Sequence, residues 1–332
     1  MNTRISTLLY YCFAVIIVYL VFITLFNTAE HFNPVGSGES GETKERKIQN
    51  STQEHDALPE DKNWKETATQ PLSSCSETEN VVFRNVTPST VYQNFYSCAS
   101  PLWERFQGSS YQILPIWAYS SSVCDQKVDI PLIPYRTKDK TYWGIPPQCQ
   151  SQHTLVTLGI RYDHLAIRKM RKSWGKPLVA YGTSAFQWRN ADYDRFYNYA
   201  IGVNGTGIQT IYDEQDGRIL ELKNTSVKAF FQKVLELKII DMLWINLEGG
   251  EFEYWKYFGK NGEFTEMGIT VCQMNLEFDN YDAKHFETFM TEMLTSKWYI
   301  SMRPTAIRKE RITRAFFLNV NDPICVGKYL KL

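Results

Sequence analysis

The sequence predicts an α/β fold in which helices cover both faces of a mostly parallel β-sheet. Three observations from residue 153 onward support this prediction. Apolar runs of strand length alternate with segments of helical periodicity, several of the runs end abruptly in glycine or polar residues, and two strand-like runs close the chain. Alternation of strands and helices is typical of parallel sheets that are buried on both faces.

The predicted elements follow one another along the chain. Residues 153–160 form a short apolar run with a glycine near its end, and the next segment carries apolar residues at helical spacing. Residues 176–186 repeat the pattern of a strand followed by glycine. Further strands are predicted at residues 197–203, 238–250, 268–278, 298–304 and 312–320, and further helices at residues 226–237 and 282–295. The last two strands are expected to form an antiparallel pair.

The segment DMLWINLEGGEFEYW, residues 241–255, joins a buried strand to a polar end. Asn246, Glu248 and Glu251 follow an apolar run that is suited to complete burial. Ligands of parallel sheets bind beyond the carboxyl ends of the strands, so these side chains are expected at a ligand-facing edge. Glu251 is equally well explained as an acidic cap of the next helix. Glu277 ends the following strand in a similar way.

The amino terminus predicts a membrane anchor. Residues 5–29 carry no charge and residues 8–26 are nearly all apolar, which lets a helix cross a hydrocarbon core of roughly 30 Å. A cleaved signal peptide is the alternative. The positive-inside rule places the short tail in the cytosol and the rest of the chain in the lumen or outside. We therefore expect a single-pass type II membrane protein of the ER, Golgi or cell surface, with the membrane as a partner.

The chain divides into four predicted parts. Residues 1–30 hold the cytosolic tail and the signal-anchor helix, and residues 31–73 are polar enough to form a flexible stem. Residues 74–150 place proline and cysteine between short apolar runs, which predicts a small irregular subdomain. Residues 151–332 hold the predicted sheet. Four sequons, which indicate a glycoprotein, lie at Asn50, Asn85, Asn204 and Asn224.

Six cysteines follow the predicted anchor, and none has the short spacing of a zinc or thioredoxin-type site. In an oxidising compartment, four of them are predicted to form disulfides: Cys75, Cys98, Cys124 and Cys149. Cys272 lies within an apolar run and is expected to be a buried small hydrophobe. The histidines are too scattered to predict a metal site.

The charge balance argues against nucleic acid as a partner. Lys plus Arg and Asp plus Glu each number 36, and no long basic stripe is present. The segment Asp192-Tyr193-Asp194 matches the D-x-D pattern with which many glycosyltransferases hold a metal and a sugar nucleotide. The pattern is short, and the solvated start of a helix explains it better.

Four landmarks occur in a fixed order: HTLVTLGIRYD, VAYGTSAF, DMLWINLEGGE, and GITVCQMNLEF with the terminal RAFFLNVNDPICVGKYL. On these motifs, residues 153–332 resemble the methyltransferase domain of the FkbM type, most closely its membrane-anchored or secreted nematode-type members. The resemblance implies a class I methyltransferase-like, Rossmann-like fold with a seven-stranded sheet. Such a sheet binds S-adenosylmethionine at its carboxyl edge.

The resemblance also implies site residues. Cofactor-binding positions of the family match Gly159, Asp163, Gly182, Ser184 and Asn246. Glu248 or Glu277 would remove the proton from an oxygen nucleophile while it accepts the methyl group. The acceptor is expected to be a glycan or a secreted small molecule, and no metal is expected.

Three departures from the family pattern coincide at the predicted cofactor site. The chain has Arg161 where the family has the second glycine of Gly-Ile-Gly. It has Ser184 where the family has a ribose-binding carboxylate, and Asn246 where the family has an aspartate. A catalytically inactive methyltransferase-fold binding protein of the secretory pathway is therefore the alternative function. A type II glycosyltransferase, favoured by the membrane topology and the D-x-D pattern, is a third.

Overall fold

The computed structural model describes most of the chain from residue 90 onward, in the ranges 90–106, 108, 113–128, 130–138, 140–149, 151–159, 164–175, 178–184, 192–202, 207–213, 218–247, 251–278, 283–307 and 312–330. The predicted anchor and stem lie outside these ranges, as do Asp163, Glu248, Arg161, Cys75 and the sequons at Asn50, Asn85 and Asn204. Within the described ranges, no helix is long and apolar enough to cross a membrane.

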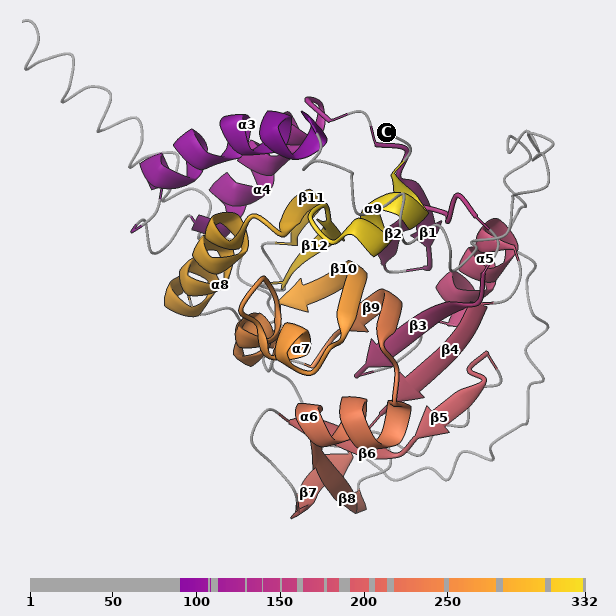
Figure 1. The fold of residues 1–332 in the computed structure, drawn as a ribbon. Helices are drawn as coiled ribbons and strands as arrows, with labels where there is room; N and C mark the ends of the chain where they lie inside the picture. The colour runs from indigo at the N-terminus through magenta and orange to yellow at the C-terminus, as the bar shows by residue number, and fades with distance from the viewer. Residues whose placement is uncertain are drawn as a thin grey trace, which may run out of the picture. The chain divides into compact units, whose positions relative to one another are not determined.

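Seven strands form one mixed sheet (Figure 1). They are β3 (His153–Leu158), β4 (Leu178–Thr183), β5 (Arg195–Tyr197), β9 (Ile239–Ile245), β10 (Thr270–Phe278), β11 (Tyr299–Ile307) and β12 (Ile312–Asn319), in the spatial order β11-β12-β10-β9-β3-β4-β5. The strands from β10 to β5 are parallel, and β12 runs antiparallel to both of its neighbours. This mostly parallel sheet confirms the predicted α/β class and fits the class I methyltransferase fold.

The chain enters the sheet in the middle, at β3. From there β4 and β5 extend the sheet to one side, while β9 and β10 extend it to the other. The strand order therefore reverses between β3 and β9, and in α/β sheets such a reversal marks the place where ligands bind, beyond the carboxyl ends of the strands. Every residue of β3 is buried, as an inner strand requires.

The two faces of the sheet are covered by different elements. Side chains of a strand alternate between its faces. In β10, Asn275 bonds to the hairpin of β1 (Ile133–Arg136) and β2 (Thr141–Gly144), whereas Phe278 packs edge-on against Phe286 and Phe289 of helix α8 (Ala283–Ser296). The hairpin and α8 therefore lie on opposite faces.

The remaining helices complete this cover. Helix α4 (Ile113–Asp125) packs against α3 (Thr90–Phe106), α8 and β11, and the three helices lie together beside β11 in Figure 1. Helix α5 (His164–Trp174) contacts β1 and β4, and its Trp174 donates a hydrogen bond to Tyr135 of β1 at 2.9 Å.

The structure differs from the predicted elements at residues 197–226. The strand expected at residues 197–203 is divided between β5 and β6 (Tyr199–Gly202), and β6 joins a separate three-stranded sheet with β7 (Gly207–Asp213) and β8 (Arg218–Ser226). The sequon residue Asn224 lies on β8. The helix predicted at residues 226–237 begins at Ser226, whose side chain accepts a hydrogen bond from Ala229, and continues as a π-helix over Phe230–Leu235.

Disulfides connect distant parts of the chain. Cys98 and Cys124 join α3 to α4, and Cys149 is disulfide-bonded as well, which confirms three of the four predicted disulfide formers. The expectation that Cys272 is only a buried hydrophobe is wrong, because it is bonded to Cys325 of α9 (Pro323–Tyr329). The two cysteines are 53 residues apart and meet because the last helix returns to β10.

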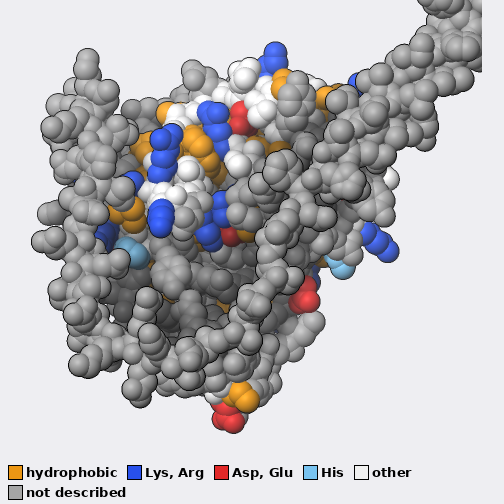
Figure 2. All heavy atoms as spheres, turned by 180° about the vertical axis from the view of Figure 1, so that it is seen from behind, with side chains coloured by type: hydrophobic (Ala, Val, Ile, Leu, Met, Phe, Trp, Pro, Cys, Tyr) orange, Lys and Arg blue, Asp and Glu red, His pale blue; other side chains and the backbone are white. Residues whose placement is uncertain are grey.

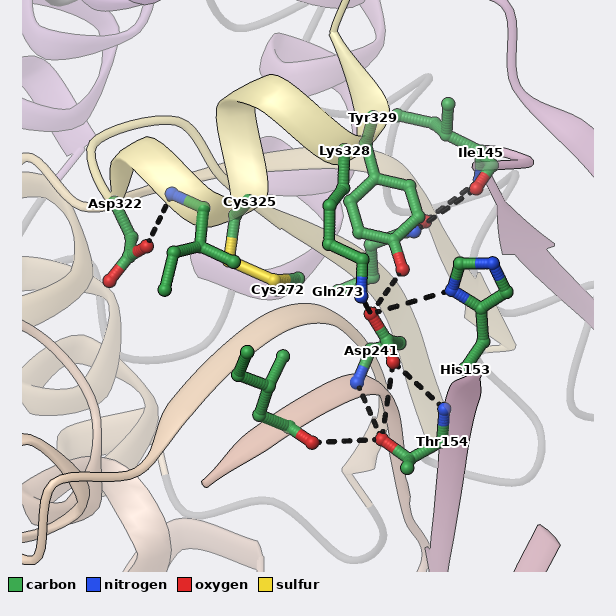
Figure 3. A network of polar contacts seen from close by, with 12 residues as sticks. Ile145, His153, Thr154, Asp241, Cys272, Gln273, Asp322, Cys325, Lys328 and Tyr329 are labelled. Atoms are coloured by element: carbon green, nitrogen blue, oxygen red, sulfur yellow. Dashed lines mark hydrogen bonds and ion pairs between the residues drawn. A yellow bond between two sulfur atoms is a disulfide. The ribbon is translucent and has the colours of Figure 1, made fainter. Parts of the chain in front are cut away.

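A buried carboxylate joins the last helix to the amino ends of β3 and β9 (Figure 3). Asp241 is 1% exposed. It accepts hydrogen bonds from the backbone N–H of Thr154 at 2.8 Å, from Lys328 Nζ at 2.6 Å and from the Tyr329 hydroxyl at 2.5 Å. His153 Nδ1 lies 3.8 Å from the same carboxylate. Figure 3 shows Lys328 and Tyr329 pointing down from α9 onto this group.

The charge of Asp241 makes part of the stability depend on pH. Burial raises the pKa of the Asp241 carboxyl, but His153 and Lys328 lower it by more, so that the pKa falls to about 2 from its ordinary value of 3.8. Because the pKa is lower in the folded state than in the unfolded state, the carboxylate contributes stability above about pH 4, and this contribution is lost as the pH falls toward about 2.

The Asp241→Asn variant tests this contribution. Between about pH 5 and about pH 2, the free energy of unfolding of the wild type should fall by about 2 kcal/mol more than that of the variant. At neutral pH the variant should be less stable by roughly 3–5 kcal/mol, because Lys328 is left buried without its counter-charge. Urea unfolding at a series of pH values measures both effects. Equal pH slopes for the two proteins would contradict the assignment.

Candidate functional site

The parallel strands bring their carboxyl ends to one edge of the sheet, opposite to Asp241. Asn246, which follows β9, donates its backbone N–H to Leu158 of β3 at 3.0 Å. Its side-chain amide donates to Glu277 of β10 at 3.4 Å. Gly159, which follows β3, donates its N–H to Thr183 of β4 at 3.2 Å. The structure therefore brings the predicted site residues Gly159, Asn246 and Glu277 to one place.

Gly159 is required by the packing of the chain itself. Its φ is +76°, and a Cβ atom at this position would lie 1.7 Å from the backbone oxygen of Asn246. A residue with a side chain is therefore excluded by both conformation and space. The glycine permits the turn after β3 to pass directly over the end of β9.

The two predicted cofactor residues at the end of β4, Gly182 and Ser184, are buried. Gly182 does not end the strand, because β4 continues through Thr183, and it is in register with Thr157 and Phe196. Ser184 follows the strand, is 3% exposed, and donates its N–H to Tyr197 at 3.3 Å. Their assignment to the cofactor stays a prediction from the resemblance.

Glu277 has both of its oxygens engaged. Oε1 accepts from Lys140 Nζ at 3.0 Å and from Asn246, and Oε2 accepts from Arg314 Nε at 2.7 Å. The side chain is only 9% exposed. A general base needs a free lone pair within reach of the substrate proton. Glu277 therefore anchors two cations in the cavity lining, and its predicted role as a base stays a prediction.

Glu251 is buried at the start of the 3-10 helix η3 (Glu251–Tyr257). Its carboxylate accepts a hydrogen bond from the backbone N–H of Leu247, which precedes this helix. The bond ties η3 to the end of β9, and both roles that the sequence left open for Glu251 stay predictions.

Polar side chains of β10 hold the β1–β2 hairpin over the sheet. The amide of Asn275 accepts from the N–H of Trp143 at 2.9 Å and donates to its carbonyl at 2.8 Å. The amide of Gln273 bonds in the same two ways to Ile145, at 2.8 and 3.1 Å. Each side-chain amide thus forms, with the backbone of one residue in this segment, the two hydrogen bonds that a neighbouring β-strand would form. The regular spacing of Gln273, Asn275 and Glu277 in a buried strand is the sequence signal for this contact.

A cavity of about 420 Å³ lies between this hairpin and the carboxyl edge of β9 and β10. Its aromatic walls include Tyr142, which is stacked on Trp244 at 4.1 Å between ring centroids, and Trp143. The cationic residues of its lining are Arg136, Lys138, Lys140, Arg303 and Arg314, and its acidic residue is Glu277. None of these cations was predicted, because they come from the hairpin and from β11 and β12.

Three buried polar atoms that belong to the lining of the cavity have no hydrogen-bond partner in the described part of the chain. They are Thr157 Oγ1, Trp244 Nε1 and Asn246 Oδ1. All three belong to the ends of β3 and β9, where the strand order reverses. Buried polar groups in proteins are nearly always satisfied. Other buried polar atoms without a partner occur elsewhere in the described ranges, for example on Trp117, His153 and Ser301, but these three belong to residues that line one cavity.

Arg303 is held in a strained conformation at the same cavity. It lies in a β-bulge of β11, between Met302 and Thr305, with φ at +49°, a conformation that costs a non-glycine residue roughly 1–2 kcal/mol. Its backbone N–H donates to the buried Asp125 at 2.7 Å, and its guanidinium lies 5.3 Å from the ring centre of Trp143. Burial raises the pKa of Asp125 to about 6, while Arg303 opposes this rise. Strain of this kind is concentrated at functional sites.

The aspartates of the D-x-D pattern have structural partners. Asp192 accepts from Arg168 at 2.7 Å, and Asp194 accepts from Arg171 at 2.5 Å and from the N–H of Ala180 at 2.7 Å. They tie α5 to the segment that enters β5, and no helix starts there. Within the described ranges, no group of three His, Cys, Asp or Glu side chains is placed to hold a metal.

Comparison with solved structures finds methyltransferases to which this chain is weakly similar. No family model and no curated protein matches the chain. Aeropyrum pernix fibrillarin bound to S-adenosyl-L-methionine is 9% identical, with a TM-score of 0.28, over 50% of this chain and 66% of that one. TrmK of M. capricolum bound to S-adenosyl-homocysteine is 12% identical, with a TM-score of 0.27, over 52% and 63%. Human methyltransferase 10 domain containing protein is 10% identical, with a TM-score of 0.28, over 70% and 100%.

The chain thus spans less than two thirds of the length of the fibrillarin and TrmK chains that it matches. TM-scores of 0.27 and 0.28 do not by themselves establish a shared fold. The class I methyltransferase fold rests on the order and directions of the seven strands. Membership of the FkbM type stays a prediction.

The described strand ends carry some of the features that the resemblance assigns to the S-adenosylmethionine site and lack others. Gly159 adopts the left-handed turn after β3, and this glycine is also required because a Cβ atom there would meet the backbone of Asn246. Within the described residues no carboxylate follows β4, where the buried Ser184 stands. The carboxylate of Glu277, near the end of β10, forms ion pairs with two cations.

A pair of glycine variants tests the packing at this edge. Gly159→Ala should lower the free energy of unfolding by roughly 3 kcal/mol or more, because the new Cβ meets the Asn246 carbonyl. Gly175→Ala is the matched control, since Gly175 has a similar φ of +70° and nothing within 4 Å of its Cβ position; it should cost about 1 kcal/mol. Chemical denaturation measures both, and equal losses would show that the Asn246 contact is unimportant.

Proposed function

We propose that this chain is a methyltransferase-fold protein of the secretory pathway that binds a glycan or a polar small molecule and does not transfer methyl groups. The observation that carries the proposal is the set of three unpartnered polar atoms on the floor of the cavity, on Thr157, Trp244 and Asn246. The cavity volume, about 420 Å³, falls within the range of small-molecule sites.

The floor of the cavity offers both donors and acceptors. The Trp244 N–H can only donate, the Asn246 oxygen can only accept, and the Thr157 hydroxyl can do both. Leaving a buried polar group without a partner costs about 1–3 kcal/mol. The residues that line the cavity carry donors, acceptors and charges, which favours a sugar or a polyol over an apolar ligand.

The same edge lacks the groups that methyl transfer requires. Glu277 is engaged by Lys140 and Arg314, and the amide of Asn246 is no substitute for a base. The ribose-binding carboxylate of the family is replaced by Ser184. These losses support binding without chemistry.

Methyl transfer from S-adenosylmethionine to an oxygen nucleophile is the second candidate. The class I fold and the left-handed glycine turn after β3 favour it. In that case Glu248 would be the base, since Glu277 is occupied. A type II glycosyltransferase is favoured less, because both aspartates of the D-x-D pattern are paired with arginines of α5.

The placement of the protein is part of the proposal. A signal-anchor at residues 8–26 would hold the chain in the membrane with the binding domain in the lumen or outside. The disulfides of α3, α4 and α9 support an oxidising compartment.

Calorimetric titration with S-adenosylmethionine separates the two candidates. The full-length chain, made in a secretory host and purified in a neutral detergent, should show no binding heat up to roughly 1 mM ligand, a weak-binding limit of about 4 kcal/mol. S-adenosylhomocysteine should give the same result. Saturable binding of either compound would contradict the proposal that methyl transfer is lost, and it would favour the second candidate.

Two threonine variants on β3 test the cavity floor without a ligand. Thr157→Val removes a buried hydroxyl that has no partner, so the free energy of unfolding should stay unchanged or rise by up to about 1 kcal/mol. Thr154→Val is the control, because the Thr154 hydroxyl donates to Ile239 at 2.9 Å and accepts from the N–H of Asp241 at 3.1 Å; it should cost about 1–3 kcal/mol. If Thr157→Val destabilises as strongly as Thr154→Val, the hydroxyl has a structural role and the proposed floor fails.

A further inference from the structure

The lining of the cavity carries more positive than negative charge. Five cationic side chains line it, against the single carboxylate of Glu277. Two of the five, Lys140 and Arg314, are paired with that carboxylate. Arg303 forms an ion pair with the buried Asp125, which lies outside the lining, at 3.8 Å. Arg136 and Lys138 have no ion-pair partner among the residues that the structure describes. Within the described residues the cavity therefore carries an excess of positive charge, which an anion would neutralise.

The basic surface extends beyond the cavity. Lys169 of α5 donates to the backbone oxygen of Arg136 at 2.7 Å, which joins the basic helix α5 to the hairpin. Figure 2 shows Lys and Arg side chains gathered on the upper part of one face, with few acidic side chains between them. A field of one sign around a cavity raises the local concentration of ligands of the opposite sign.

Arg303 is preorganised to hold the anion. Three features fix it: the β-bulge of β11, the hydrogen bond from its backbone N–H to Asp125, and the contact of its guanidinium with Trp143. Arg303 Nε also forms an ion pair with Asp125 Oδ2 at 3.8 Å. The planar guanidinium has five N–H donors, which suit the paired oxygens of a carboxylate, sulfate or phosphate. An arginine that is already ordered loses less freedom when it binds.

We infer that the ligand of this cavity is an acidic saccharide, whose hydroxyls face the polar residues of the lining and whose anionic group is held by Arg303 at the cavity wall. The inference rests on the proposed function and adds the charge of the ligand to it. The acidic group is a sulfate, a phosphate or a carboxylate. Arg136 and Lys138 add charge without a fixed geometry.

The test compares matched sugars on the full-length chain in neutral detergent. Glucose 6-sulfate, glucose 6-phosphate and glucuronic acid are titrated beside glucose, at low and at moderate ionic strength. At least one acidic sugar should bind roughly tenfold or more tightly than glucose, and added salt should weaken it. The preferred acid identifies the anionic group. Equal affinity for glucose and for all three acids would overturn the inference.

Variants of Arg303 provide the second arm. Arg303→Gln should weaken binding of the acidic sugar roughly ten- to hundredfold and abolish the preference for the acidic sugar over glucose. Arg303→Gly should do the same without loss of folding, because glycine accepts the left-handed conformation at this position. Lys172→Gln, on the exposed side of α5, removes one positive charge outside the cavity and should change the affinity by less than about twofold.

The outcomes distinguish this inference from the proposed function. Acidic sugars that bind independently of Arg303 but are lost in Thr157→Val would overturn the anion site and leave the binding cavity standing. Failure of all four sugars to bind, together with destabilisation by Thr157→Val, would overturn both.

Discussion

The buried carboxylate of Asp241 is the constraint on which the fold depends. It lies at the amino end of β9 and accepts hydrogen bonds from β3 and from two side chains of the last helix. Three segments far apart in the sequence therefore share one charge. A buried carboxylate is costly unless it is paired and hydrogen-bonded, so the chain folds in the way that supplies these partners. The disulfide between Cys272 and Cys325 fixes the same helix to β10.

This arrangement closes one edge of the sheet and leaves the other for function. At the amino edge, the polar atoms of Asp241 and Thr154 are satisfied by the chain itself. At the carboxyl edge of the same two strands, Thr157 Oγ1, Trp244 Nε1 and Asn246 Oδ1 lack partners. The contrast lies within β3 and β9, a few residues apart. The contrast is not complete, because both ring nitrogens of His153, at the amino end of β3, also lack a hydrogen-bond partner in the described part of the chain.

The central part of the fold could be predicted from the sequence because its signals are local. Apolar runs of strand length identify β3, β9 and β10, and the glycine and polar residues after them identify the carboxyl edge. The hairpin β1–β2 escaped prediction because four-residue strands carry little periodicity. The pairing of Cys272 with Cys325 escaped it because their distance in sequence, 53 residues, says nothing about contact in space.

The location of the candidate site could be predicted from the sequence, but the ion pairs of its residues could not. Polar residues after β9 and β10 were expected at the ligand-facing edge, and Asn246 and Glu277 lie there. Their roles depend on partners from elsewhere: Lys140 comes from the hairpin, and Arg314 comes from β12, which runs in the opposite direction. No local pattern reveals that two cations will meet one carboxylate. The ion pairs of Glu277 therefore came from the structure alone, and its role as a base stays a prediction.

The ion pairs of Glu277 also bear on the proposed binding role of the cavity. Its carboxylate is held by Lys140 at 3.0 Å and by Arg314 at 2.7 Å, so it is part of an ion-pair group in the cavity lining. The other cations of the lining face no carboxylate within it. A cavity whose described lining carries more cations than carboxylates attracts anions, and this charge pattern fits the proposed anionic ligand.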